Sequence, residues 1–180
     1  MKKSLILLSG LVAANVVTIQ ANTTPERPAF SVRAECFESL PGDGVTSEST
    51  EKGTLVRWSI RYPLRQNRVL AKRITAGLLG DTTSMSFWIR GDSRHELGLQ
   101  LIQDEGSGFT KLIHVDSQWK QLHLPYTDFQ SNEQRAQGVD PQRINRLVLV
   151  DYAATLTPQK RGRTIWLSDW RFAADRLTQA

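Results

Sequence analysis

Nine side chains on predicted strands, or at the ends of strands, could bind a ligand through hydrogen bonds. They are Arg57, Ser59, Arg61, Gln100, Lys111, Gln121, His123, Asp151 and Tyr152. Together these groups donate and accept hydrogen bonds, and such a set beside an aromatic ring suits reversible binding of a polar ligand. An ordinary solvated sheet face would carry a similar set, so convergence of these residues in space decides between the two interpretations.

The five tryptophans are the side chains most able to stack on a flat ligand. Trp58, Trp88 and Trp119 lie in predicted strands where their spacing matches the core, so we expect all three to be buried. Trp166 and Trp170 share one face of the last predicted strand, and one of them is expected to be exposed.

The sequence lacks the motifs that mark common catalytic sites. There is no G-x-S-x-G, H-E-x-x-H or P-loop segment, and the three histidines have no metal-ligand spacing. We therefore expect a protein that is not an enzyme. A pair of carboxylates, as in glycosidases, stays open because only their separation in space would reveal it.

Two-residue alternation of apolar and polar side chains runs through most of the chain. In the run Trp119–Phe129, Leu122 and Leu124 lie on one face, Gln121 and His123 on the other, and Pro125 ends the strand. Such a pattern predicts an all-β fold, an antiparallel β-sandwich. The predicted strands are 34–38, 54–62, 69–74, 84–90, 97–102, 109–115, 120–124, 146–151 and 164–172.

Two further segments interrupt these strands. Residues 40–53 are polar and rich in turn-forming types, which predicts a long loop. Asp140 followed by Pro141 predicts a short helical turn, with Asp140 as its cap.

The first residues predict export from the cytoplasm. Lys2 and Lys3 precede an apolar stretch that is too short for a membrane span, which is the pattern of a signal peptide. We expect a signal peptide over 1–21, a linker over 22–29 and one β-sandwich domain over 30–176, in the periplasm or secreted. No transmembrane segment is expected. Cys36 is the only cysteine, so an intramolecular disulfide is excluded.

A mild excess of basic residues, 23 Lys and Arg against 18 Asp and Glu, bears on possible partners. Nucleic acid is not expected as a partner of an exported chain without a recognition motif. Anionic glycans or phospholipid head groups fit that location better, and a solvated rim explains scattered arginines equally well.

Five segments occur in an order that resembles the galactose-binding-like jelly rolls. Within that group the chain is similar to family 11 carbohydrate-binding modules and, more loosely, to the complex I intermediate-associated family. The likeness covers roughly residues 34 to 172, and the segments that carry it are 86–92, 97–101, 119–129, 140–147 and 164–172.

The resemblance implies a function and a metal. It implies that a polysaccharide or oligosaccharide binds on the concave sheet, with the nine residues named above as candidates. It also implies a structural Ca²⁺ between the first and last strands, where Glu38 and Asp169 occupy the matching places. Solvated or ion-paired acids at strand ends are the alternative for these two residues. An envelope protein that uses the same fold to dock or assemble another protein is the alternative function.

Overall fold

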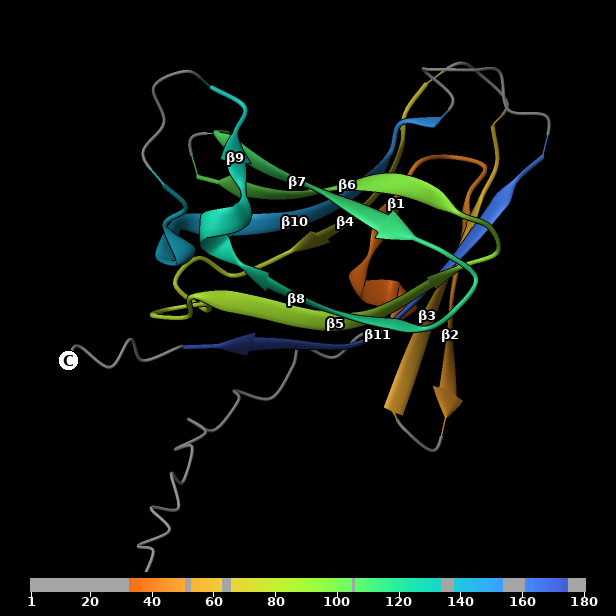
Figure 1. The fold of residues 1–180 in the computed structure, drawn as a ribbon, viewed down its shortest axis with the longest axis horizontal. Helices are drawn as coiled ribbons and strands as arrows, with labels where there is room; N and C mark the ends of the chain where they lie inside the picture. Colours follow the sequence, from red (N-terminus) through yellow and green to blue (C-terminus); the bar gives the residue numbers. More distant parts are fainter. Residues whose placement is uncertain are drawn as a thin grey trace, which may run out of the picture.

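Two antiparallel sheets packed face to face make up the computed structural model of this protein (Figure 1). It describes residues 33–50, 53–62, 66–104, 106–133, 138–153 and 161–174. The strand order is β1-β4-β10-β6-β7-β9 in the six-stranded sheet and β2-β3-β11-β5-β8 in the five-stranded sheet. The predicted all-β sandwich is confirmed.

The six-stranded sheet consists of β1 (Glu38–Ser39), β4 (Arg68–Arg73), β6 (His95–Gln103), β7 (Gly108–Val115), β9 (Gln130–Ser131) and β10 (Ile144–Asp151). The five-stranded sheet consists of β2 (Gly44–Thr50), β3 (Gly53–Ile60), β5 (Ser84–Gly91), β8 (Lys120–Pro125) and β11 (Arg163–Ala173). The described residues also contain three short 3-10 turns: η1 (Ala34–Cys36) before β1, η2 (Tyr126–Asp128) between β8 and β9, and η3 (Pro141–Arg143) between β9 and β10.

The core lies between the two sheets and is built by alternation along each strand. Trp58, Phe87 and Leu167 from the five-stranded sheet are buried against side chains such as Leu99 and Leu149 from the six-stranded sheet. Alternate residues of the same strands face outward, so each sheet has one dry face and one outer face. The faces predicted for 54–62 and for 120–124 are confirmed.

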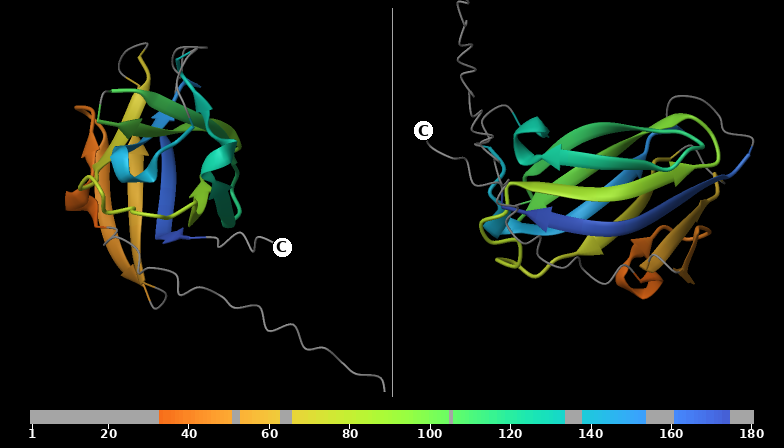
Figure 2. Two further views of the ribbon diagram at one scale, coloured as in Figure 1. Left: turned by 90° about the vertical axis from the view of Figure 1, so that its left-hand side faces the viewer. Right: turned by 60° about the horizontal axis from the view of Figure 1, so that its bottom comes forward.

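The segment predicted as a long loop contains a strand. β2 pairs with β3 from Gly44 opposite Ser59 to Thr50 opposite Gly53. The prediction was wrong because β2 is an edge strand whose hydrogen bonds to β3 do not require burial, and only Val45 packs on the core. The β2 and β3 ribbon extends away from the rest of the sandwich in two views (Figures 1 and 2).

The segment 34–38 forms less strand than predicted. Residues Ala34–Cys36 form the 3-10 turn η1, and β1 is limited to Glu38 and Ser39, which pair with Ala71 and Leu70 of β4. The predicted turn at Pro141 is confirmed, since a carboxylate oxygen of Asp140 accepts a hydrogen bond of 3.0 Å from the Gln142 N–H.

A bulge in β11 separates its two tryptophans. The register with β5 shifts between Ser168 and Arg171, and Asp169 has a positive φ of 54°. The expectation that Trp166 and Trp170 share one face is wrong, because the inserted residue reverses the alternation. Trp170 is buried and stacks on Phe87 at 4.6 Å between ring centroids, whereas Trp166 lies on the outer face.

The predicted signal peptide and linker lie outside the described residues. Within the described part of the chain, no helix has the length and apolar character needed to cross a membrane.

Candidate functional site

Three tryptophans occupy the outer face of the five-stranded sheet. The side chains of Trp88 and Trp119 are 37% and 38% exposed, and Trp166 is half-buried. The predicted burial of Trp88 and Trp119 was wrong. Phe87 and Ile89 point into the core, so Trp88 between them must point outward. Trp119 lies two residues before the exposed Gln121 of β8, so its side chain points to the same outer face.

Arg90 lies between two of these indoles. Its guanidinium carbon is 4.4 Å from the ring centroid of Trp166 and 5.2 Å from that of Trp119. Both distances fall within the range of cation–π attraction. The Arg90 Nε is shielded from solvent and finds no hydrogen-bond partner among the described residues. Arg90 therefore helps to hold both aromatic planes in place.

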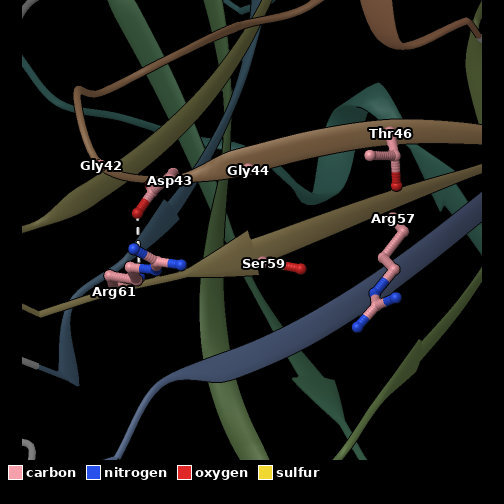
Figure 3. Close-up of a pocket in the computed structure, with 7 residues that line it drawn as sticks. All are labelled: Gly42, Asp43, Gly44, Thr46, Arg57, Ser59 and Arg61. Carbon is pink, nitrogen blue, oxygen red and sulfur yellow. Dashed lines mark hydrogen bonds between the residues drawn. The ribbon is translucent and has the colours of Figure 1, made fainter.

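A pocket of about 430 Å³ opens at the β2 and β3 edge of the same sheet (Figure 3). Arg57, Ser59 and Arg61 line it from the β3 side, and Thr46 lines it from β2. Three of the nine predicted binding residues therefore converge in one concavity. The remaining lining residues are Gly42, Asp43 and Gly44.

Asp43 lies in this pocket with its carboxylate fully occupied by protein groups. It accepts hydrogen bonds from the Trp58 indole N–H at 3.2 Å and from the backbone N–H of Arg61 at 2.9 Å. Arg68 forms an ion pair with it at 2.8 Å, and both of these side chains are completely buried. The sequence prediction missed Asp43 and Arg68 because Asp43 fell in the predicted loop 40–53 and Arg68 came just before the predicted strand 69–74.

The pocket and the tryptophans form one continuous surface. Arg57 is the cross-strand partner of Trp166, which in turn is the partner of Arg90. In Figure 3 the Arg57 side chain extends over β11, the strand that carries Trp166. The distance from β3 to β8 is three strand spacings, or roughly 14 Å. We call this surface the tryptophan face and define it by Trp88, Trp119, Trp166, Arg90, Arg57, Ser59 and Arg61.

Two more predicted residues lie beside the tryptophan face. Gln121 is the cross-strand partner of Trp88, and His123 is that of Ser86. Both side chains are exposed. Five of the nine predicted residues therefore lie on the outer face of this sheet.

Gln100 and Tyr152 lie on the other side of the molecule, on the outer face of the six-stranded sheet. The Gln100 side-chain N–H donates to the Tyr152 hydroxyl at 3.1 Å. The Tyr152 ring lies directly over Gly98, where a Cβ atom would come within 2.7 Å of it. This pair is separated from the tryptophan face by the whole core.

Lys111 and Asp151 are engaged in contacts within the protein. The Lys111 ammonium lies 3.3 Å from an Asp128 carboxylate oxygen. Asp151 is fully buried, accepts a 2.6 Å hydrogen bond from the Tyr62 hydroxyl and lies 3.7 Å from Arg163. Burial, reinforced by the Asp151 carboxylate, raises the pKa of Tyr62 far above its ordinary value. This cluster joins the strand ends, and its Asp151 does not reach the surface.

Each of the two acids predicted to bind Ca²⁺ forms an ion pair with an arginine. Glu38 contacts Arg73 at 2.7 Å in the six-stranded sheet, and Asp169 contacts Arg171 at 2.9 Å in the five-stranded sheet. Among the described residues no group of three or more His, Cys, Asp or Glu side chains could hold a metal ion. Calcium prefers six to eight oxygen ligands, which these two separately paired acids do not assemble. Calcium binding stays a prediction.

Comparisons with known proteins bear on the fold. No family model and no curated protein matches the chain. Among solved structures, it is similar to a family 11 carbohydrate-binding module from Clostridium thermocellum in complex with a β-1,3-1,4-mixed-linked tetrasaccharide. The two share 15% sequence identity and a TM-score of 0.61, over 82% of this chain and 95% of the module.

Two other kinds of structure match as well. A family 30 carbohydrate-binding module of a cellulosomal cellulase from Clostridium thermocellum matches at a TM-score of 0.54 and 14% identity, over 84% of this chain and 91% of that one. An exo-β-agarase matches at 0.56 and 11% identity over 77% of this chain, but only over 23% of its own length. This chain therefore has the β-sandwich fold of family 11 and family 30 carbohydrate-binding modules.

Proposed function

We propose that this protein binds carbohydrate on the tryptophan face and does not catalyse a reaction there. The observation that carries the proposal is the position of Trp88, Trp119 and Trp166 on one outer sheet face, with Arg90 held between two of them. The fold shared with carbohydrate-binding modules supports the same class of ligand.

The physical basis of binding is a combination of apolar stacking and polar contacts. An exposed indole buries apolar surface against the flat face of a sugar ring, and stacking adds to that burial. Arg57, Ser59 and Gln121 lie beside the indoles, where they can hydrogen-bond sugar hydroxyls. Because Arg90 already holds two of the rings, little side-chain ordering is needed on binding.

Export of the protein to the periplasm or beyond is part of this proposal. It is supported by the charged and apolar pattern of the first 21 residues. A polysaccharide-binding surface would meet its ligand outside the cytoplasm. Docking of an envelope protein, the alternative function, stays a prediction.

Affinity gel electrophoresis against soluble polysaccharides tests the proposal. Mixed-linked β-1,3-1,4 glucan and agarose are suitable first ligands, because one structure with this fold holds a mixed-linked tetrasaccharide and another is an agarase. We expect the purified protein to be retarded by at least one polysaccharide. Absence of retardation by every neutral and acidic polysaccharide, for a protein with a folded circular dichroism spectrum, would contradict it.

Substitution of the tryptophans then locates the binding surface. Trp88→Ala and Trp119→Ala should each weaken binding about tenfold, equivalent to about 1.4 kcal/mol. Leu112→Ala is the matched control, since Leu112 is 54% exposed on the six-stranded sheet. When the protein is incubated with the polysaccharide that retards it, a reducing-sugar assay should detect no cleavage of that polysaccharide.

A further inference from the structure

We propose that the ligand of the tryptophan face is an acidic polysaccharide whose carboxylate or sulfate groups bind to Arg57 and Arg61. This inference rests on the proposed function and names its substrate class. The observations behind it are the charges of the pocket in Figure 3.

Arg57 and Arg61 place two available guanidinium groups at the pocket. Both residues are exposed, both line the pocket, and Ser59 lies between them on the same side of β3. Among the described residues neither guanidinium has an ion-pair partner, although the backbone N–H of Arg61 donates to Asp43. Arg90, enclosed by the indoles of Trp119 and Trp166, adds a third positive charge to this surface.

The acidic residue inside the pocket does not oppose an anion. Asp43 is completely buried and forms an ion pair with the equally buried Arg68. This pairing cancels the negative charge at the base of the pocket, where a free carboxylate would repel an anionic ligand.

Asp92 and Glu48 also lie near the pocket, and among the described residues neither forms an ion pair with Arg57 or Arg61. The Asp92 carboxylate accepts a hydrogen bond from the Thr164 N–H at 2.8 Å. Glu48 lies on the outer side of β2, opposite Leu55 and two cross-strand rows from Arg57. The pocket itself therefore presents positive charge to a ligand.

The chemistry of arginine favours an anionic sugar over a neutral one. A guanidinium offers a planar set of donors that matches the two oxygens of a carboxylate or two oxygens of a sulfate. A neutral sugar that covered the same group would remove its water without supplying an opposite charge. The indoles stack on either kind of sugar, so the arginines set the preference for acidity.

Matched polysaccharide pairs test the inference. Binding is measured by isothermal titration for polygalacturonan and its carboxyl-reduced form, and for a sulfated galactan and its desulfated form. We expect at least a tenfold preference for the charged member of at least one pair, and which pair shows it identifies carboxylate or sulfate as the bound group. Affinity for the charged polymer should fall as NaCl rises from 50 to 500 mM.

Single substitutions place the charge effect at the pocket. Arg57→Gln and Arg61→Gln should each lower affinity for the charged polymer about tenfold and affinity for its neutral form less than twofold. Arg146→Gln is the matched control because it removes the same charge from the outer side of the six-stranded sheet. It should change neither affinity more than twofold.

The possible outcomes separate the inference from the proposed function. Equal binding of charged and neutral members overturns the inference and leaves carbohydrate binding intact. No binding of any polysaccharide overturns the proposed function. Tighter binding of oligo(dT) than of every acidic polysaccharide overturns the inference in favour of nucleic acid, because stacking rings and arginines also suit single strands. If Arg146→Gln lowers affinity for the charged polymer as much as Arg57→Gln does, the inference is overturned in favour of non-specific electrostatic attraction.

Discussion

The carboxylate of Asp43 and the guanidinium of Arg68 form an ion pair at 2.8 Å with both side chains fully buried. Arg68 also donates to the carbonyl oxygen of Pro41 at 2.9 Å, which fastens the segment before β2 onto β4. The pair thus joins the two sheets below the pocket, since Asp43 precedes an edge strand of one sheet and Arg68 begins β4 of the other.

Removal of one member of this pair should strongly destabilise the fold. Asp43→Asn leaves the buried Arg68 charge uncompensated, and we expect a loss of about 3–5 kcal/mol in the free energy of unfolding. Urea denaturation followed by tryptophan fluorescence measures it. Arg73→Met, which breaks the exposed pair with Glu38, should cost less than about 1 kcal/mol. Similar losses of unfolding free energy in Asp43→Asn and Arg73→Met would contradict a special role for the buried pair.

Gly98 is required because the Tyr152 ring lies against its backbone. Gly98→Ala would bring a Cβ within 2.7 Å of the ring, so the tyrosine must move and lose its hydrogen bond from Gln100. We expect a cost of about 1 kcal/mol or more.

A double-mutant cycle checks the cause of that cost. In a Tyr152→Ala background, Gly98→Ala should cost much less, because the clashing ring is absent. An undiminished cost would show that the clash with Tyr152 is not responsible. Urea denaturation provides all four free energies.

We expect the protonation of His95 to lower the free energy of unfolding in mild acid. Its ring is buried, its Nδ1–H donates to the Ser93 carbonyl oxygen at 2.7 Å, and burial lowers the pKa of its imidazole below 6.5. The unfolded chain then binds the proton more readily, so this stability is present above about pH 6.5 and is lost as pH falls through the lower folded pKa. The slope from this group is up to about 1.4 kcal/mol per pH unit.

Unfolding free energies measured from pH 8 to pH 5 check this prediction. His95→Gln should reduce the slope in that range. His123→Gln, which replaces an exposed histidine of β8, is the control and should keep the slope of the parent protein. An unchanged slope in His95→Gln would exclude His95 as its source.

The bulge at Asp169 should not accept a β-branched residue. At φ 54° a valine is strained, and we expect Asp169→Val to cost about 1–3 kcal/mol. Asp169→Asn is the control, since asparagine tolerates this conformation and only an exposed ion pair with Arg171 is lost. Thermal unfolding would rank the two variants, and equal melting temperatures would contradict the role of the backbone.

Most of the fold could be predicted from the alternation of side chains. Residues such as Val56, Trp58 and Ile60 repeat at two-residue spacing on the dry face of β3, and their burial follows from that spacing. β2 could not be predicted in this way. Its residues are exposed on both sides apart from Val45, and backbone pairing at a sheet edge leaves no pattern in the side chains.

The site was predictable in part. Arg57, Ser59 and Arg61 were candidates because they share one polar side of a clear strand, and the pocket contains all three. The outward direction of Trp88 was available in its apolar neighbours Phe87 and Ile89, but the general tendency of tryptophan to be buried was given more weight. No local pattern links Asp43 to Arg68, because their contact joins separate sheets.

Four of the seven residues that line the pocket come from β2 and the segment just before it, and β2 pairs with β3 alone within the described part of the chain. Fraying of this outermost ribbon would abolish the concavity while the interior of the sandwich stayed intact. Occupancy of the pocket and closure of the ribbon are therefore thermodynamically linked, and a bound ligand should slow amide hydrogen exchange in β2 more than in the central strands.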